Sequence, residues 1–404
     1  MNVLERFLKY VSYYTQSSEE SKTVPSTPEQ KIFGEELVRE LLDMGLEARI
    51  DEKGYVYGEI PATSGHEKEP AIGLIAHMDT AESACGKNVK PRIVKVYDGG
   101  DITLNEKLGI VLKPSEFQTL EDNIGKDLIV TDGTTLLGAD DKAGIAEIMA
   151  LAERLTREPG IAHGTIKLAF TPDEEVGRGA DHFDIEGFHA DFAYTVDGGA
   201  IGELEYENFN AASAVFHIHG INIHPGQAKN KMKNACLIVG ELMAMMPPAE
   251  TPAATEGYEG FYHLSSMEGR EDHAMLRYLV RDHSMDKFQA RKQFLSRLAE
   301  YLNAKYGAGT VELLLKDTYY NMKEKLEPYP FVIERAKAAV EAEGITPVVA
   351  PIRGGTDGSR LSWEGLPCPN LSTGGYNFHG YFEYIPVQSL EKMVDILVRL
   401  VRAS

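Results

Sequence analysis

The sequence predicts an α/β protein with a mostly parallel sheet, into which a smaller α+β unit is inserted. Three observations predict this fold. Short apolar runs alternate with helical patterns over the first half of the chain, a β-α-β-β-α-β pattern follows from about residue 208, and the α/β alternation resumes near residue 328. Strands separated by helices are typical of parallel sheets. We therefore expect one discontinuous domain, residues 1–207 and 323–404, around an inserted domain, residues 208–322.

The first half of the chain supplies the strands of the larger domain. An amphipathic helix is expected at the N-terminus, the apolar runs 71–76, 165–170 and 192–196 indicate buried strands, and 143–155 has helical spacing. Each strand runs into a polar motif: His-Met-Asp after the first, Thr-Pro-Asp-Glu-Glu after the second and Asp-Gly-Gly after the third. In sheets of this kind, ligands bind at the carboxyl ends of the strands.

The inserted segment has the pattern of a separate α+β unit. Residues 211–219 alternate apolar and polar side chains with period two, as a half-exposed antiparallel strand does. A helix is expected at 227–246, strands around 260–281, a second helix at 286–306 and a last strand at 310–319.

The composition is that of an acidic globular protein. The 404 residues are 43% hydrophobic and 25% charged, and 41 basic against 62 acidic residues give a formal net charge of −21. Such a chain has no net cationic field for nucleic acid or anionic lipid, and no apolar run approaches the roughly 20 residues that cross a bilayer. The three cysteines, Cys85, Cys236 and Cys368, form no CxxC pair, which favours a reducing compartment. We expect a cytoplasmic protein with no nucleic-acid and no membrane partner.

Seven acidic and histidine side chains fall at expected strand ends or in short Gly-rich loops. Imidazole and carboxylate ligands together suit zinc and similar divalent ions. Two metals sharing one bridging carboxylate need five such ligands, which leaves one acid to orient a histidine and one to act as general base. The seven residues are His77, Asp79, Asp140, Glu174, Glu175, Asp197 and His379.

These residues also have plain structural interpretations. Asp140 and Asp141 precede a helix, where Asp is a preferred N-cap, and Asp141 is the better candidate for that role. Glu174 and Glu175 fit an acidic first helical turn, and Asp197-Gly-Gly fits a simple turn. The set as a whole favours a metal site, because these residues end apolar strands that would lie side by side. The sequence has no GxxxxGK[ST] loop and no GxSxG elbow, which argues against P-loop and elbow-type serine chemistry.

Five motifs in order resemble the co-catalytic zinc aminoacylase/carboxypeptidase family of metallopeptidases, M20. They are AHMDT (76–80), GADDKAG (138–144), TPDEEVG (171–177), TVDGG (195–199) and FHG (378–380). Longer segments are similar to the tripeptide aminopeptidases of that family: ELEYENFNAAS (203–213), TEGYEGFYHL (255–264), PIRGGTDG (351–358) and LPCPNLSTGGYNFHG (366–380). The resemblance covers nearly the whole chain.

The resemblance implies two zinc ions per subunit, with cobalt or manganese as alternative occupants. His77 and Asp197 would bind one ion, and Glu175 and His379 the other. Asp140 would bridge both.

The resemblance also implies catalytic roles. Asp79 would orient His77, and Glu174 would activate the water bound between the zinc ions and then protonate the leaving amine. The predicted reaction is metal-dependent hydrolysis of the N-terminal peptide bond of tripeptides, which releases the N-terminal amino acid. Short peptides would be the substrates. A homodimer is compatible with the resemblance, because monomeric and dimeric members both occur in the wider family.

The inserted domain would be a ferredoxin-like lid over the zinc-peptidase domain. His224 resembles a lid histidine that stabilises the oxyanion, and its alternative is an exposed turn residue before Pro225. Arg281 and Arg353 resemble residues that bind the substrate carboxylate or the oxyanion, a task that suits the fixed and permanently charged guanidinium fork. The alternative for Arg281 is a surface ion pair with Asp282 or Asp286. The alternative for Arg353 is a structural salt bridge near Asp357.

Two other functions stay open. The first is a dipeptidase, carboxypeptidase or N-acyl deacylase, because the same metal site would serve each of them. The second is a catalytically silent metal- or peptide-binding protein. Glu174 argues against the second, because a non-enzyme has no need of an extra carboxylate beside a ligand.

Overall fold

The structure, a computed structural model, describes residues 1–403, and the chain forms two compact units. Unit 1 comprises Met1–Tyr206, Glu324–Ala350 and the residues from Thr356 to the end of the described chain. Unit 2 comprises Glu207–Lys323 and Pro351–Gly355. The domain limits predicted near residues 208 and 322 stay a prediction, because compactness alone does not show that a segment folds independently.

Unit 1 is built on an eight-stranded sheet with the strand order β1-β2-β8-β3-β9-β16-β10-β15. Its strands are β1 (Glu47–Ile50), β2 (Val56–Ile60), β3 (Ile72–His77), β8 (Ile166–Thr171), β9 (Phe192–Gly198), β10 (Glu203–Glu205), β15 (Val348–Val349) and β16 (Asn370–Ser372). Four of the seven pairings between neighbours are parallel, and both pairings of β3 are among them. The mostly parallel sheet predicted from the sequence is confirmed.

Helices cover both faces of this sheet. One face packs against α1 (Val3–Tyr10), α2 (Pro28–Asp43), α3 (Ala139–Arg157), α8 (Pro330–Ala342) and α10 (Val387–Val401). The other face packs against α4 (Ile185–Phe188) and α9 (Asp357–Trp363). Because β3 is central and covered on both sides, all six of its residues are buried, and its sequence is continuously apolar rather than alternating.

A smaller set of strands in unit 1 was not predicted. A three-stranded sheet has the order β17-β7-β4, and a separate hairpin pairs two short strands. The strands are β4 (Arg92–Val94), β5 (Ile102–Asn105), β6 (Ile110–Leu112), β7 (Leu128–Val130) and β17 (Tyr384–Pro386). A short helix, α7 (Lys323–Leu326), lies where the chain passes from unit 2 back to unit 1. β17 follows the loop that holds His379, so its pairing with β7 anchors that loop.

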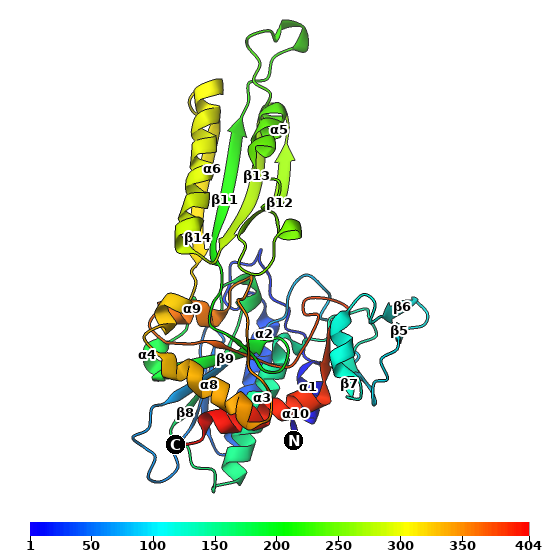
Figure 1. The fold of residues 1–404 in the computed structure, drawn as a ribbon, viewed down its shortest axis with the longest axis vertical. Coiled ribbons are helices and arrows are strands. Elements are labelled where there is room, and N and C mark those ends of the chain that lie inside the picture. The colour runs from blue at the N-terminus through cyan, green and yellow to red at the C-terminus, as the bar shows by residue number, and fades with distance from the viewer. Residues whose placement is uncertain (404) are drawn as a thin grey trace. The chain divides into compact units, whose positions relative to one another are not determined.

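Unit 2 has a four-stranded antiparallel sheet with the order β12-β13-β11-β14. Its elements are β11 (Asn210–His219), α5 (Ala235–Met245), β12 (Phe261–Gly269), β13 (His273–Asp282), α6 (Met285–Tyr306) and β14 (Val311–Tyr319) (Figure 1). Both helices pack on one face of the sheet, around Phe216, Leu276 and Phe288. The β-α-β-β-α-β order and the ferredoxin-like arrangement expected for this segment are confirmed.

The helix predicted at 227–246 was placed too early, because α5 begins at Ala235. Asn234 stops the helix from extending further back: its side-chain oxygen accepts the Leu237 N–H at 3.3 Å, as an N-cap does. The residues before it form a 3-10 turn and a backbone bridge between Ile221 and Lys233. Within residues 1–403, no helix combines the length and the apolar composition that crossing a bilayer requires.

Candidate metal centre

The ends of three neighbouring strands bring most of the predicted site residues together. β3 is parallel to both β8 and β9, so the carboxyl ends of all three meet at one edge of the sheet. β3 ends at His77, a short turn with Glu174 and Glu175 follows β8, and β9 contains Asp197. Asp140 comes from the start of α3. All of these residues, and His379 from the loop before β17, belong to unit 1.

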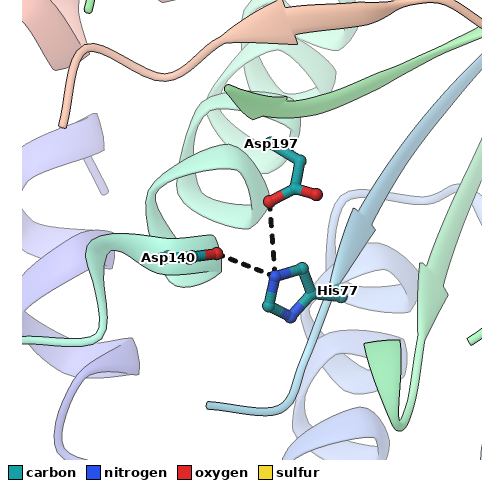
Figure 2. Close-up of side chains that lie close together, drawn as sticks. All are labelled: His77, Asp140 and Asp197. Carbon is teal, nitrogen blue, oxygen red and sulfur yellow. Dashed lines mark hydrogen bonds and ion pairs between the residues drawn. The ribbon is translucent and has the colours of Figure 1, made fainter. Parts of the chain in front are cut away.

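Asp140 lies between two histidines. Its Oδ1 is 2.9 Å from His77 Nε2, and its Oδ2 is 3.0 Å from His379 Nε2. The His77 Nε2 atom is also 3.3 Å from Asp197 Oδ1 (Figure 2), and the His379 Nε2 atom is 3.0 Å from Glu175 Oε2. The five residues thus form two groups of three that share Asp140, and in each group the potential ligand atoms lie within 4.8 Å of one another.

The chemistry of this cluster fits two divalent cations. Each group offers one imidazole nitrogen and two carboxylates, a set that suits zinc and related ions. The Oε1 atom of Glu175 is buried and has no hydrogen-bond partner among the described residues. An orphaned buried acceptor is costly, and a bound cation would supply the missing partner.

The charges of the cluster shift the pKa values of its members. Hydrogen bonds to Asp140 and Glu175 raise the pKa of His379 to about 11. Burial raises the pKa of Glu175 to about 7 and that of Asp197 to about 6. Burial opposes the ionisation of Asp140, but hydrogen bonds from His379 and His77 hold its pKa well below the usual range.

Asp79 connects His77 to the turn that holds Glu174. Its buried carboxylate accepts the N–H of Glu174 at 3.0 Å through Oδ1 and the N–H of Glu175 at 3.1 Å through Oδ2. Its Oδ1 lies 3.4 Å from His77 Nδ1, and its backbone carbonyl oxygen lies 3.0 Å from the same nitrogen. Burial and the negative charge of Asp197 raise the pKa of Glu174 well above its usual value, which suits a group that accepts and releases a proton during a reaction.

Several buried charged residues around this cluster were not singled out as site residues. Asp141 accepts the backbone N–H of His77 at 3.1 Å and that of Gly144 at 3.1 Å, which confirms it as the capping residue. Asp357 accepts the hydroxyl of Thr171 at 2.8 Å. The remaining two are Lys142 and Glu383. The sequence could have drawn attention to these residues by their position, because each lies within a recognised motif or a few residues after one.

The three residues predicted to bind substrate all belong to unit 2. His224 is exposed, and its Nδ1 accepts the Gly226 N–H at 3.2 Å. The guanidinium of Arg281 donates to two backbone carbonyl oxygens at 3.2 and 3.5 Å, and its Cζ lies 5.2 Å from the centroid of the Tyr319 ring. The guanidinium of Arg353 is tightly held, because it donates at 2.7 to 3.3 Å to three carbonyl oxygens and one hydroxyl of residues 255–259.

A strand edge that gathers two histidines and two carboxylates around one shared aspartate has the residues of a metal-dependent hydrolase. The family model described as Peptidase family M20/M25/M40 matches residues 132–403, which is more than half of the chain. Peptidase T of Caldanaerobacter subterraneus subsp. tengcongensis is 56% identical over 400 residues, covering 99% of this chain and 98% of that protein. The chain belongs to peptidase family M20/M25/M40, and it is a hydrolase.

Two solved structures match the fold over almost the whole length. The crystal structure of aminopeptidase PepT from Bacillus cereus has a TM-score of 0.76 and 26% identity, covering 99% of this chain and 97% of that one. A tripeptidase from Staphylococcus aureus has a TM-score of 0.79 and 22% identity, with the same coverage.

Proposed function

We propose that this protein is a tripeptide aminopeptidase, which hydrolyses the first peptide bond of short peptides and releases the N-terminal amino acid. The observation that supports it most directly is the cluster in which Asp140 is shared between His77 and His379, beside the turn that holds Glu174. The full-length similarity to Peptidase T and to aminopeptidase PepT supports the choice of substrate.

The five clustered residues are the proposed metal ligands. His77, Asp140 and Asp197 would hold one ion, and Asp140, Glu175 and His379 would hold the other. We propose zinc in both positions, because the ligands are imidazole and carboxylate. Two such ions would polarise the peptide carbonyl and lower the pKa of the attacking water.

Glu174 is the proposed proton carrier. It would accept a proton from the attacking water and deliver it to the nitrogen of the leaving amine. Its backbone is fixed for this task, because Asp79 holds the N–H groups of Glu174 and Glu175 together. The same carboxylate lies against His77, so one buried side chain aligns a proposed ligand with the proposed base.

Arg281 and His224 are the proposed substrate contacts of unit 2. A tripeptide ends in a carboxylate, which a guanidinium recognises well. Of the two predicted arginines, Arg281 has the less engaged guanidinium, while Arg353 donates to residues 255–259. We therefore assign substrate binding to Arg281 first, and loop support to Arg353.

A product analysis tests the proposed function. Zinc-loaded protein is incubated with an unblocked tripeptide and with its N-acetylated form, and the products are identified by mass spectrometry. Release of the first amino acid from the unblocked peptide alone is the expected result. Cleavage of the acetylated peptide, or release of the C-terminal residue, would instead indicate a deacylase or a carboxypeptidase. The Glu174→Gln variant is the control, and it should keep its metal while losing at least about a hundredfold in rate.

We propose the cytosol as the compartment and keep a homodimer as a prediction. Cys85 and Cys236 are exposed thiols, and a reducing compartment would keep them unpaired. Sedimentation equilibrium of the zinc-loaded protein would determine the number of subunits.

A further inference from the structure

Glu383 is a buried carboxylate outside the proposed ligand set. Only 2% of the surface of Glu383 is exposed to solvent. Its Oε2 accepts the N–H groups of Leu137 at 2.7 Å and Gly138 at 2.8 Å, and its Oε1 accepts the N–H of Asp140 at 3.1 Å. Three backbone donors of the segment that leads to Asp140 therefore converge on one side chain.

These contacts serve a segment that cannot pair its own backbone groups as a helix does. Gly138 has a φ of 82°, and Asp140 and Asp141 have non-helical backbone angles, so the regular part of α3 begins only after Asp141, which caps it. The N–H groups of Leu137, Gly138 and Asp140 lie before that start, and buried N–H groups need an acceptor. Glu383 supplies the acceptor oxygens from a position 245 residues away from Gly138 in sequence.

Glu383 also belongs to the loop that presents His379. That loop is closed by two backbone hydrogen bonds between Tyr376 and Tyr384, at 2.9 and 3.1 Å. Glu383 therefore joins the backbone of Asp140 to the loop of His379, whose Nε2 meets the Asp140 carboxylate. One side chain thus spans the two segments that present Asp140 and His379.

We propose that Glu383 is a positioning residue, which holds Asp140 between the two proposed metal positions so that both ions bind together. This inference rests on the proposed function. A glutamine in its place would keep the size of the side chain but would turn an NH2 group toward backbone donors. Asp140 would then be free to move toward one position, and the second ion would lose its shared ligand.

Metal titration of the Glu383→Gln variant tests this role without any substrate. Zinc binding is followed by isothermal titration, and the cobalt-loaded protein is examined by electron paramagnetic resonance for coupling between the two ions. We expect the second ion to bind about tenfold to a hundredfold more weakly than in the unaltered protein, with loss of the coupling. The Glu383→Asp variant keeps the carboxylate, so it should restore part of the affinity for the second ion and part of the coupling. It also replaces the glutamine variant in this test if that variant does not fold.

The matched control is Glu40→Gln. Glu40 is also a buried carboxylate of unit 1, and its hydrogen bonds go to Arg6, Lys9 and Tyr10. It should lose stability without a change in zinc affinity. Equal losses of zinc affinity in the Glu40 and Glu383 variants, or an unchanged second affinity in Glu383→Gln, would overturn the proposal. If the titration behaves as expected but no peptide is cleaved, the proposed function fails while the role of Glu383 stands.

Discussion

Gln30 and Asp173 exchange two hydrogen bonds: the Asp173 N–H donates to Gln30 Oε1 at 3.0 Å, and Gln30 Nε2 donates to Asp173 Oδ1 at 2.8 Å. Both residues are fully buried. Asp173 has a φ of 61°, in the left-handed region that non-glycine residues seldom adopt. The exchange holds this turned backbone immediately before Glu174, and the Asp173 carboxylate also accepts the N–H and the hydroxyl of Ser26.

We predict that Gln30→Ala lowers both stability and turnover. The buried N–H of Asp173 would be left without a partner, which costs about 1–3 kcal/mol, while its carboxylate would keep the two donors of Ser26. The turn of Glu174 would relax, so kcat should fall severalfold while KM changes little. Urea unfolding and steady-state kinetics measure the two effects.

The control for this prediction is Asn303→Ala. Asn303 makes the same kind of exchange in unit 2, where it donates to Val311 O at 2.7 Å and accepts the Val311 N–H at 2.9 Å. It should lose similar stability and keep its kcat. Equal losses of kcat in both variants would show that Gln30 acts only through stability.

The sequence predicted the larger features of the fold because they depend on local patterns. β3 and β8 lie within one residue of the apolar runs that predicted them, and β9 starts where its run starts. Residues that end neighbouring parallel strands must meet, so the approach of His77 to Asp197 could be anticipated before any coordinates. The role of each proposed ligand stays a prediction.

The sequence could not reveal contacts between distant segments. Gln30 lies 143 positions from Asp173, and Glu383 lies 243 positions from Asp140. Neither residue stands out by periodicity or composition. The partners of a buried polar side chain come from segments that are distant in sequence, and the local pattern does not reveal them. The start of α5 was missed for a local reason, because the side chain of Asn234 caps the helix there.

We predict that Arg281→Met raises KM for tripeptides with a free carboxyl terminus. A hydrogen-bonded charge pair is worth about 1.5–3 kcal/mol, so KM should rise by about tenfold to a hundredfold. The same variant should act on a tripeptide amide as the unaltered protein does, because the amide has no carboxylate. Arg277→Met, an exposed arginine on the same strand, is the control. A similar rise for the acid and the amide would exclude this role for Arg281.

Removal of the metal should destabilise unit 1 selectively. All five proposed ligands belong to unit 1, and three of them are carboxylates that approach one another when no cation is bound. A ligand present at 1,000 times its Kd stabilises the folded state by about 4 kcal/mol. Hydrogen exchange after chelation should therefore show lost protection in residues 137–141, 171–177 and 376–384. Protection in β11 and β13 should stay unchanged, and an equal loss there would contradict this prediction.

The stability of the metal-free protein should fall as the pH rises from about 4.5 to 7, in part through Glu205. Burial raises the pKa of Glu205 to about 7 in the folded state, although Asn370 donates to its carboxylate at 2.7 Å. The unfolded value is about 4.3, so between these values the folded state binds more protons than the unfolded state. The free energy of unfolding therefore decreases with rising pH, by up to about 4 kcal/mol from this one group.

The Glu205→Gln variant should remove this part of the pH dependence. Glutamine keeps an oxygen for Asn370 and cannot ionise, so the variant should gain stability over the unaltered protein as the pH rises from 5 to 8. Urea unfolding at each pH unit measures the difference. Glu343→Gln is the control, because hydrogen bonds from Arg399 and Lys392 lower the pKa of Glu343. The contribution of Glu343 to the free energy of unfolding is therefore complete above about pH 4.3. The stability of its variant should differ from that of the unaltered protein by a constant amount from pH 5 to 8. Parallel curves for the Glu205 variant and the unaltered protein would show that Glu205 is ionised in the folded state throughout.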